Sequence, residues 1–401
     1  MKLEIERIEK AAEVLKGITR ETKLIYSPVF STESGNEIYL KPENLQLTGA
    51  FKIRGAYFKI SCLTGEEKKR GLIASSAGNH AQGVALAAQM QGVRSTIVMP
   101  KTTPLIKVEA TKNFGARVIL EGDCYDDAYQ EARRLEKKED LVFIHPFDDY
   151  DVMAGQGTIG LEILDDLEDV HSIIVPIGGG GLISGIAAAV KARRPDVRII
   201  GVEPDGARAM TDSIFKNKIQ TLHKVDTIAD GVAVKTPGSR PFSVIKDLVD
   251  EIITVSDAEL MESFLLLLER HKLIAENSGV LSLAALHKLK VRGEKIVPVI
   301  SGGNIDVVTI SSMIDRGLVK RGRIFCFSAE MPDEPGQLLK ISEILADENA
   351  NIIKLDHNQF KTLDRFKQVL LEVTVETNGH EHVRKIIKAL EKGGYSIDRV
   401  Y

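Results

Sequence analysis

A lysine lies in an otherwise apolar stretch of the sequence, and its surroundings favour a reactive amine. The stretch is LQLTGAFKIRGAYFKI, residues 45–60, and its Lys52 follows Phe51 and a Thr48-Gly49 break. A helix beginning at Thr48 or Gly49 would place Lys52 in its first turn, where the positive end of the helix dipole lowers the pKa of an ammonium. Burial behind Phe51 would lower that pKa further and make the amine a better nucleophile. The alternative is a surface lysine on an amphipathic helix.

Four consecutive glycines form a second feature with chemical meaning. Gly178, Gly179, Gly180 and Gly181 follow the apolar run SIIVPI and precede the small-residue run LISGIAAAVKA. Without Cβ atoms the backbone can wrap closely around an anion, with the amides of a helix start pointed at it. This indicates a phosphate site, and a loose strand-to-helix turn is the alternative. No GK[ST] follows and the dinucleotide fingerprint fits poorly, so we expect the phosphate of something smaller than a dinucleotide.

Two further polar turns each follow an apolar, strand-like run. They are SSAGNHAQG at residues 75–83 and SGGN at residues 301–304. Backbone amides at a helix start suit a carboxylate, and the amide of Asn79 can bond an oxygen. Taken separately, each turn is equally consistent with an ordinary helix cap, a packed His80 or simple turn chemistry. A lysine that forms a Schiff base, together with a compact phosphate cup, is nevertheless what a pyridoxal phosphate enzyme needs.

Apolar strands alternate with helices from about residue 37 to residue 310, and these elements would position the polar turns. GLIASSAGNHAQGVALAAQMQG runs from a strand through a turn into an alanine-rich helix, and SIIVPIGGGG and KIVPVISGGN repeat the strand-to-turn pattern. Continuous apolar strands predict a parallel sheet covered on both faces. Because ligands bind at the carboxyl ends of the strands in such sheets, the glycine-rich turns should line a ligand site.

The last part of the chain changes character. From Arg323 the order strand, helix, strand, strand, helix, strand predicts one β-α-β-β-α-β unit, about the length of a small ferredoxin-like domain. We therefore expect a catalytic domain at residues 1–315, a linker at 316–322 and a separate domain at 323–401.

Composition and charge exclude several classes of protein. With 401 residues the chain exceeds one typical core, and 53 Lys and Arg against 57 Asp and Glu give no sign of a nucleic-acid partner. Cys62, Cys124 and Cys326 are too widely spaced for a metal knuckle, and we expect reduced thiols in a cytoplasmic protein. The start MKLEIERIEKAAEVL is a charged amphipathic pattern without the apolar core of a signal peptide or membrane span, so no membrane partner is expected.

Several motifs together carry a family resemblance. TGAFKIRGA, SSAGNHAQGVA, PIGGGGL and SGGN, in this order and spacing, resemble the fold-type II pyridoxal phosphate enzymes, specifically the serine/threonine dehydratases. The connecting segments HPFDD, GQGTIGLEIL and IADGVAVKTPG resemble the threonine ammonia-lyase group within that family. The resemblance implies pyridoxal 5'-phosphate as cofactor. It also implies an α/β fold of two open twisted subdomains with mostly parallel sheets, the smaller one, at roughly 53–150, inserted in the larger.

The resemblance implies roles for residues around the cofactor. Lys52 would bind the cofactor covalently and later take the Cα proton of the substrate. Phe51 would pack against the cofactor ring, and Asn79 would bond its hydroxyl oxygen. Ser301 would be the partner of the pyridine nitrogen; a neutral hydroxyl cannot keep that nitrogen protonated, which favours fast loss of a β-leaving group over a long-lived carbanion. Glu276 matches a family glutamate near the cofactor, with an ordinary helix cap as the alternative.

The resemblance also implies two anion sites. The phosphate would be held by the amides of Gly178, Gly179, Gly180, Gly181 and Leu182. The substrate carboxylate would be held by Ser76, Ala77, Gly78, Asn79 and His80. Related serine racemases carry a second serine where this chain has Ala77, so elimination is favoured over racemisation. The racemase-like divalent-metal pattern needs a carboxylate where this chain has Ala209; we therefore predict no metal, while a monovalent cation at Glu203 stays open.

The C-terminal unit carries DEPGQL at residues 333–338 and NANI at residues 349–352, and it resembles an ACT domain, a regulatory amino-acid-binding module. The resemblance implies effector contacts at Gly336 and Asn351. Isoleucine is the effector that the family suggests; valine, another amino acid, no ligand, or a purely packing domain are the alternatives. Because ACT modules commonly pair across subunits, we expect a homodimer or homotetramer.

Three functions compete. The first is a regulated threonine ammonia-lyase that converts L-threonine to 2-oxobutanoate and ammonia, and L-serine more weakly to pyruvate, in a biosynthetic pathway such as that of isoleucine or in a catabolic one. The second is another fold-type II reaction, such as β-replacement, or a serine dehydratase or racemase. The third, a catalytically silent amino-acid sensor, is disfavoured by the presence of Lys52, the glycine run and Ser301. The sequence does not fix the preference for threonine or serine, because one methyl group is worth only about 1–3 kcal/mol in a pocket.

Overall fold

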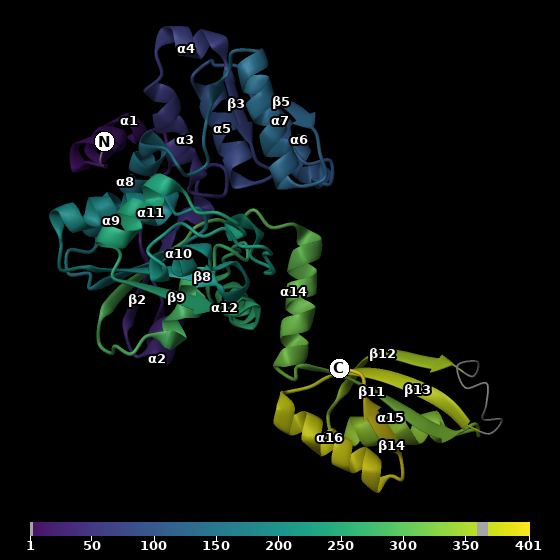
Figure 1. The fold of residues 1–401 in the computed structure, drawn as a ribbon. Coiled ribbons are helices and arrows are strands. Elements are labelled where there is room, and N and C mark those ends of the chain that lie inside the picture. The colour runs from purple at the N-terminus through teal and green to yellow at the C-terminus, as the bar shows by residue number, and fades with distance from the viewer. Residues whose placement is uncertain (1–2, 359–367) are drawn as a thin grey trace. The chain divides into compact units, whose positions relative to one another are not determined.

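The computed structural model describes residues 3–358 and 368–401, which form two compact units, Met1–Ile305 and Asp306–Tyr401 (Figure 1). Helix α14 (Val307–Lys320) occupies most of the region where the sequence predicts a linker, residues 316–322. It is helical because its buried Met313 and Gly317 recur at helical spacing and Asp306 caps its start. The functional boundary near residue 315 stays a prediction.

The first unit contains a six-stranded sheet in the order β1-β2-β10-β7-β8-β9, parallel throughout except for β1 against β2. Its strands are β1 (Ile25–Tyr26), β2 (Glu37–Pro42), β7 (Ser172–Pro176), β8 (Arg198–Pro204), β9 (Glu251–Val255) and β10 (Lys295–Ile300). The helices associated with it are α1 (Ile5–Leu15), α2 (Pro28–Ser34), α8 (Tyr150–Asp166), α9 (Gly181–Arg193), α10 (Ala209–Phe215), α11 (Ser239–Leu248), α12 (Asp257–His271) and α13 (Leu281–Ala284). Short 3-10 turns are η1 (Glu43–Leu45), η2 (Asp205–Ala207), η3 (Asp230–Val232) and η4 (Ala285–Lys288).

A second, four-stranded sheet in this unit is entirely parallel, in the order β5-β4-β3-β6. Its strands are β3 (Leu72–Ser75), β4 (Ser95–Met99), β5 (Arg117–Leu120) and β6 (Val142–Phe143), and its helices are α3 (Lys52–Ser61), α4 (Gly65–Arg70), α5 (Asn79–Met90), α6 (Leu105–Asn113) and α7 (Tyr125–Lys138). Leu72 and Ala74 pack with α3 and α5, whereas Ile73 packs with α7, so helices cover both faces. The predicted α/β fold with two mostly parallel sheets is confirmed.

The second unit has the predicted order β-α-β-β-α-β, and its sheet runs β12-β13-β11-β14 with antiparallel neighbours throughout. Its elements after α14 are β11 (Ile324–Pro332), α15 (Gln337–Asp347), β12 (Asn351–Asn358), β13 (Gln368–Glu376), α16 (His380–Lys392) and β14 (Ser396–Arg399). Every second residue of β11, from Phe325 to Met331, is buried in the core of this unit. The sequence predicts that β12 continues to Phe360, which lies outside the described residues.

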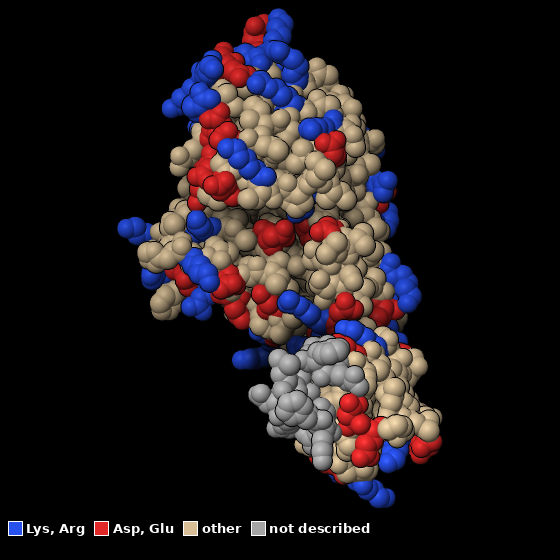
Figure 2. Space-filling model, turned by 90° about the vertical axis from the view of Figure 1, so that its right-hand side faces the viewer, with Lys and Arg blue, Asp and Glu red and all other residues tan. Residues whose placement is uncertain are grey.

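Charges of both signs are mixed over the visible face, and basic side chains gather at the top of the larger unit, at the height of α4 (Figures 1 and 2). Helix α4 ends with Lys68, Lys69 and Arg70, the solvated helix end that the charge pattern indicates. Within residues 3–358 and 368–401, no helix is both long enough and apolar enough to cross a membrane.

A buried ionic cluster fixes the start of α3. Arg54 is fully buried and donates to Glu43 through Nε (2.9 Å) and Nη2 (2.8 Å), and to Glu162 through Nη1 (2.5 Å) and Nη2 (2.9 Å). Lys41, also fully buried, donates to Glu162 at 2.6 Å. Burial alone would raise the pKa of Glu43, but the Arg54 guanidinium outweighs it and the pKa is lowered. The cluster joins α3 to η1, β2 and α8.

We expect Arg54→Ala to lower the free energy of unfolding by about 3–5 kcal/mol, because it leaves the Glu43 carboxylate buried without its cation. Urea unfolding of the full chain measures the change. Lys69→Ala is the matched control: it removes an exposed ion pair with Glu66 and should cost no more than about 1 kcal/mol. Equal unfolding midpoints for the two variants would contradict a structural role for the cluster.

Candidate active site

A pocket of about 760 Å³ opens in the first unit, and all three predicted turns reach it. Lys52, the SSAGNH turn, the glycine run and Ser301 line it together, although they lie up to 249 positions apart in the sequence, from residue 52 to residue 301. The SSAGNH and glycine turns follow the carboxyl ends of β3 and β7, and Ser301 follows β10. The three turns therefore meet at the carboxyl ends of the strands, as predicted.

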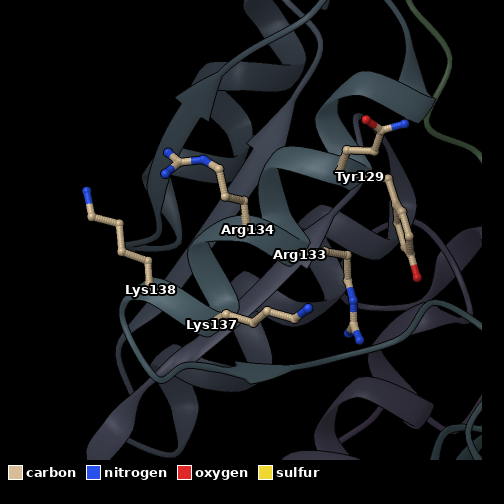
Figure 3. A pocket seen from close by; sticks show the side chains of 6 residues that line it. Tyr129, Arg133, Arg134, Lys137 and Lys138 are labelled. Atoms are coloured by element: carbon tan, nitrogen blue, oxygen red, sulfur yellow. The ribbon is translucent and has the colours of Figure 1, made fainter.

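A second hollow, of about 600 Å³, lies on the outer surface of α7 and contains none of the predicted site residues. Its basic side chains, from Arg133, Arg134, Lys137 and Lys138, project from one helix in different directions (Figure 3). Arg133 pairs with Glu136 at 2.7 Å and Arg134 pairs with a neighbouring glutamate, so this surface lacks convergent groups for one ligand.

Helix α3 begins at Lys52, about one turn later in the chain than the predicted start at Thr48 or Gly49. Lys52 is therefore in the first turn, as predicted. Its Nζ donates to the carbonyl oxygen of Pro146 at 3.0 Å and lies 5.1 Å from the centre of the Phe51 ring. Burial in the pocket lowers the pKa of Lys52 to about 8, although the charge of Glu276 acts in the opposite direction. The amine is thus partly neutral near physiological pH.

Each glycine of the 178–181 run has a steric reason; a Cβ on Gly181 would lie 2.9 Å from Phe147. A Cβ on Gly179 would lie 2.3 Å from the ring of Phe147, and one on Gly178 would lie 3.0 Å from Val232. Gly180 adopts φ +95°, a conformation that favours glycine, and caps α9. The first amides of α9 have no acceptor within the helix and border the pocket, which suits an anion.

Asn79 connects two distant turns. Its Nδ2 donates to Oε1 of Glu276 at 2.6 Å, and its Oδ1 accepts from Nδ2 of Asn304 at 2.8 Å. Burial raises the pKa of Glu276 to about 7, and the nearby Asp230 raises it as well. Asn304, which ends the SGGN motif, is a site residue that the sequence analysis missed; an amide at the end of a glycine turn is the signal that could have indicated it.

The residues predicted to hold the substrate carboxylate also line the pocket. Oγ of Ser76 accepts from the amide of Gly78 at 3.1 Å, and Ala77 presents only a methyl group. The ring of His80 is buried and its Nε2 bonds the carbonyl oxygen of Ile144 at 2.8 Å. Burial lowers the pKa of His80 to about 3, so the ring is neutral. This agrees with the alternative of a packed His80.

Three buried polar atoms at the pocket have no hydrogen-bond partner among the residues that the structure describes. They are Oγ of Ser75, Nε2 of Gln156 and Oγ of Ser278, and their residues line the pocket. Leaving such atoms unpaired costs about 1–3 kcal/mol each. They indicate a polar ligand. Ser75 belongs to the polar turn quoted from the sequence, whereas Gln156 and Ser278 were not singled out because their burial depends on the tertiary fold.

The residues near Glu203 do not fit a divalent metal. Both carboxylate oxygens are engaged, by the amide of Met210 at 2.9 Å and by the amide of Thr211 at 2.7 Å. Burial raises the pKa of Glu203 to about 7. No group of three or more His, Cys, Asp or Glu residues placed for a metal exists in the described ranges.

Residues 15–302 match the protein-family model described as "Pyridoxal-phosphate dependent enzyme". The chain belongs to this pyridoxal-phosphate dependent enzyme family. L-threonine ammonia-lyase of Thermotoga maritima is 47% identical over 394 residues, which are 98% of each chain. Among solved structures, the processed form of threonine deaminase isoform 2 from Solanum lycopersicum is 38% identical with a TM-score of 0.75, covering 78% of this chain and 92% of that one. Maize serine racemase is 35% identical with a TM-score of 0.75, covering 80% and 99%.

The pocket of this pyridoxal-phosphate dependent enzyme fits its cofactor, pyridoxal 5'-phosphate. The glycine run offers the free amides at the start of α9, Lys52 offers an amine of lowered pKa, and the unpaired atoms of Ser75 and Ser278 offer polar partners. Ser301, 4% exposed, lines the same pocket and brings a hydroxyl rather than a charge.

We expect covalent attachment of added pyridoxal phosphate to the apoprotein to accelerate about tenfold per pH unit up to pH 8 and to level off above it, because only the neutral amine of Lys52 attacks. The visible absorbance of the bound cofactor reports the rate. The same titration with free Nα-acetyl-lysine supplies the cofactor's own ionisations, and its rate should keep rising toward pH 10. A protein profile that rises like that of the free amine would mean that the pocket does not lower the pKa of Lys52.

Proposed function

We propose that this chain is an L-threonine ammonia-lyase that converts L-threonine to 2-oxobutanoate and ammonia, and L-serine more weakly to pyruvate. The observation that carries the proposal is the amine of Lys52, of lowered pKa, in one pocket with the glycine run and Ser301. The relative from Thermotoga maritima, named for this activity and similar over 98% of both chains, supports it.

The chain's own groups account for binding and proton removal. In the proposal, the amides and hydroxyls of residues 76–80 hold the substrate carboxylate and place its Cα hydrogen near Lys52. The carbonyl of Pro146 orients Nζ of Lys52, and the neutral fraction of that amine takes the Cα proton. Bound pyridoxal phosphate supplies the electron sink for this step.

The reaction balances without an oxidant or reductant. The electron pair of the Cα–H bond forms the second bond between Cα and Cβ, and the Cβ–O bond breaks. The leaving oxygen takes up one proton and departs as water. Lys52 gains one proton as the leaving oxygen consumes one. The released enamine then tautomerises and reacts with water, giving the 2-oxo acid and ammonia.

Racemisation is the second candidate, since maize serine racemase resembles this chain. Two-sided proton exchange needs a second base on the face opposite Lys52, and Ala77 offers only a methyl group at the pocket. The neutral hydroxyl of Ser301 also favours rapid loss of the leaving group. Both features support elimination over racemisation.

We expect the purified protein with pyridoxal phosphate to release 2-oxobutanoate from L-threonine and pyruvate from L-serine, with little D-serine formed, as measured by coupled assay and chiral chromatography. Lys52→Ala should lose about a thousandfold or more in turnover, because the proposal assigns removal of the Cα proton to its amine. Lys69→Ala, an exposed lysine on α4, is the control and should keep full activity. D-serine as the main product would favour the racemase, and no product from either amino acid would refute the proposal.

The proposed effector residues lie at opposite ends of α15 within one chain. Gly336 caps the start of this helix with φ +94°, and Asn351 begins β12 after its end. A helix of 11 residues is about 16 Å long, too far for one small amino acid to touch both residues. If both contact isoleucine, they belong to two copies of the C-terminal unit, which is consistent with the proposed homodimer or homotetramer.

We expect isoleucine to reduce threonine turnover by the full chain, and Asn351→Ala to raise the concentration needed about tenfold by removing one hydrogen bond, with uninhibited activity unchanged. Initial rates over an isoleucine series measure this, and light scattering reports the oligomeric state. Lys388→Ala, at an exposed position of α16, is the control. A monomer whose activity ignores isoleucine would refute both the effector and the pairing.

A further inference from the structure

His145 is held in one orientation beside the reactive amine. Its Nδ1 accepts from the amide of Asp148 at 2.8 Å and from the amide of Phe147 at 3.3 Å. The ring of Phe147 packs edge-on against it, with centroids 4.8 Å apart and planes at 85°. The intervening residue, Pro146, is the one whose carbonyl accepts from Lys52.

The turn that carries His145 is itself anchored. The carboxylate of Asp148 accepts from the amide of Arg240 at 2.9 Å and from the amide of Ser239 at 3.2 Å. The guanidinium of Arg240 also donates to the Asp148 carbonyl at 2.8 Å. The imidazole therefore cannot rotate without breaking its own bonds to a fixed turn.

These contacts determine which nitrogen carries the proton. A nitrogen that accepts from two amides is unprotonated, so in the neutral ring the proton is on Nε2. Burial lowers the pKa of His145 to about 4 although the charges of Asp148 and Asp149 oppose the shift, so the ring is neutral at physiological pH. Nε2–H has no protein partner within residues 3–358 and 368–401, and His145 lines the pocket. The pocket thus contains a fixed, uncharged hydrogen-bond donor without an acceptor.

We propose that Nε2–H of His145 donates a hydrogen bond to the β-hydroxyl oxygen of the substrate and stabilises the charge that develops on it as the Cβ–O bond breaks. This inference rests on the proposed ammonia-lyase function. The phosphate and the carboxylate of the reactants have other proposed sites, at the glycine run and at residues 76–80, which leaves the β-oxygen for this donor.

The donor acts without giving up its proton. The electron pair of the Cβ–O bond goes to the departing oxygen, where a preorganised donor lowers the barrier. Neutral imidazole is too weak an acid to transfer its proton, so the leaving oxygen takes up the proton that Lys52 removed from Cα, and His145 is unchanged after each turnover. A hydrogen bond of this kind also selects against amino acids that lack a β-oxygen.

Two substitutions separate this role from support of the turn. In His145→Asn the side-chain oxygen can still accept from the amides of Phe147 and Asp148, as in an Asx turn, but nothing reaches the position of Nε2. In His145→Gln an amide N–H can reach that position. Initial rates are measured with L-threonine, with L-serine and with β-chloro-L-alanine, whose chloride leaves without needing a hydrogen-bond donor.

We expect His145→Asn to lose about 100-fold in kcat/KM with both hydroxy amino acids and less than about threefold with β-chloro-L-alanine, and His145→Gln to recover about tenfold of the loss. Equal losses with hydroxyl and chloride substrates would show that His145 only supports the turn, and unchanged rates would show that it has no role. Either result overturns the inference. Wild-type activity on threonine would still uphold the proposed function. A wild-type protein that releases pyruvate from β-chloro-L-alanine but nothing from threonine or serine would overturn both.

Discussion

The guanidinium of Arg54, buried between the carboxylates of Glu43 and Glu162, is the interaction on which the rest of the active site depends. Burying three charges is costly, and the cost is offset only when every partner keeps its geometry. Because Arg54 lies two residues after Lys52, a rotation or shift of α3 that moved the amine would also break this cluster. The position of the reactive nitrogen is therefore tied to a network that takes no part in the chemistry.

Burial in the pocket brings the pKa values of a lysine and a glutamate closer together. Burial lowers the pKa of Lys52 to about 8 and raises that of Glu276 to about 7, whereas their mutual attraction acts in the opposite direction on both. The amine of Lys52 is therefore partly neutral near physiological pH, which suits a site where an amine must alternate between accepting and releasing a proton.

Sequence patterns predicted the features that depend on local chemistry. Apolar runs predicted parallel pairing of strands covered on both faces, the division into two sheets came from the family resemblance, and the residues before Lys52 predicted its place in the first turn of a helix. The contacts of Asn79 with Glu276 and Asn304 were not predictable, because they join residues 197 and 225 positions apart whose meeting is set by packing. The linker expected at residues 316–322 is helical as far as Lys320, because Met313 and Gly317 are buried at helical spacing in α14.

The turn at residues 145–148 explains why the cofactor cup and the substrate pocket cannot vary independently. Phe147 fills the space beside Gly179 that a Cβ would need, Pro146 holds the amine of Lys52, and His145 faces the pocket between them. A single bulkier residue in the glycine run would push Phe147 and so displace the carbonyl that orients the amine. Conversely, a change in the turn would alter the wall of the phosphate cradle. The glycines thus serve packing as much as anion binding. The steric fit of the turn at residues 145–148 couples the shape of the phosphate cradle to the position of the Lys52 amine.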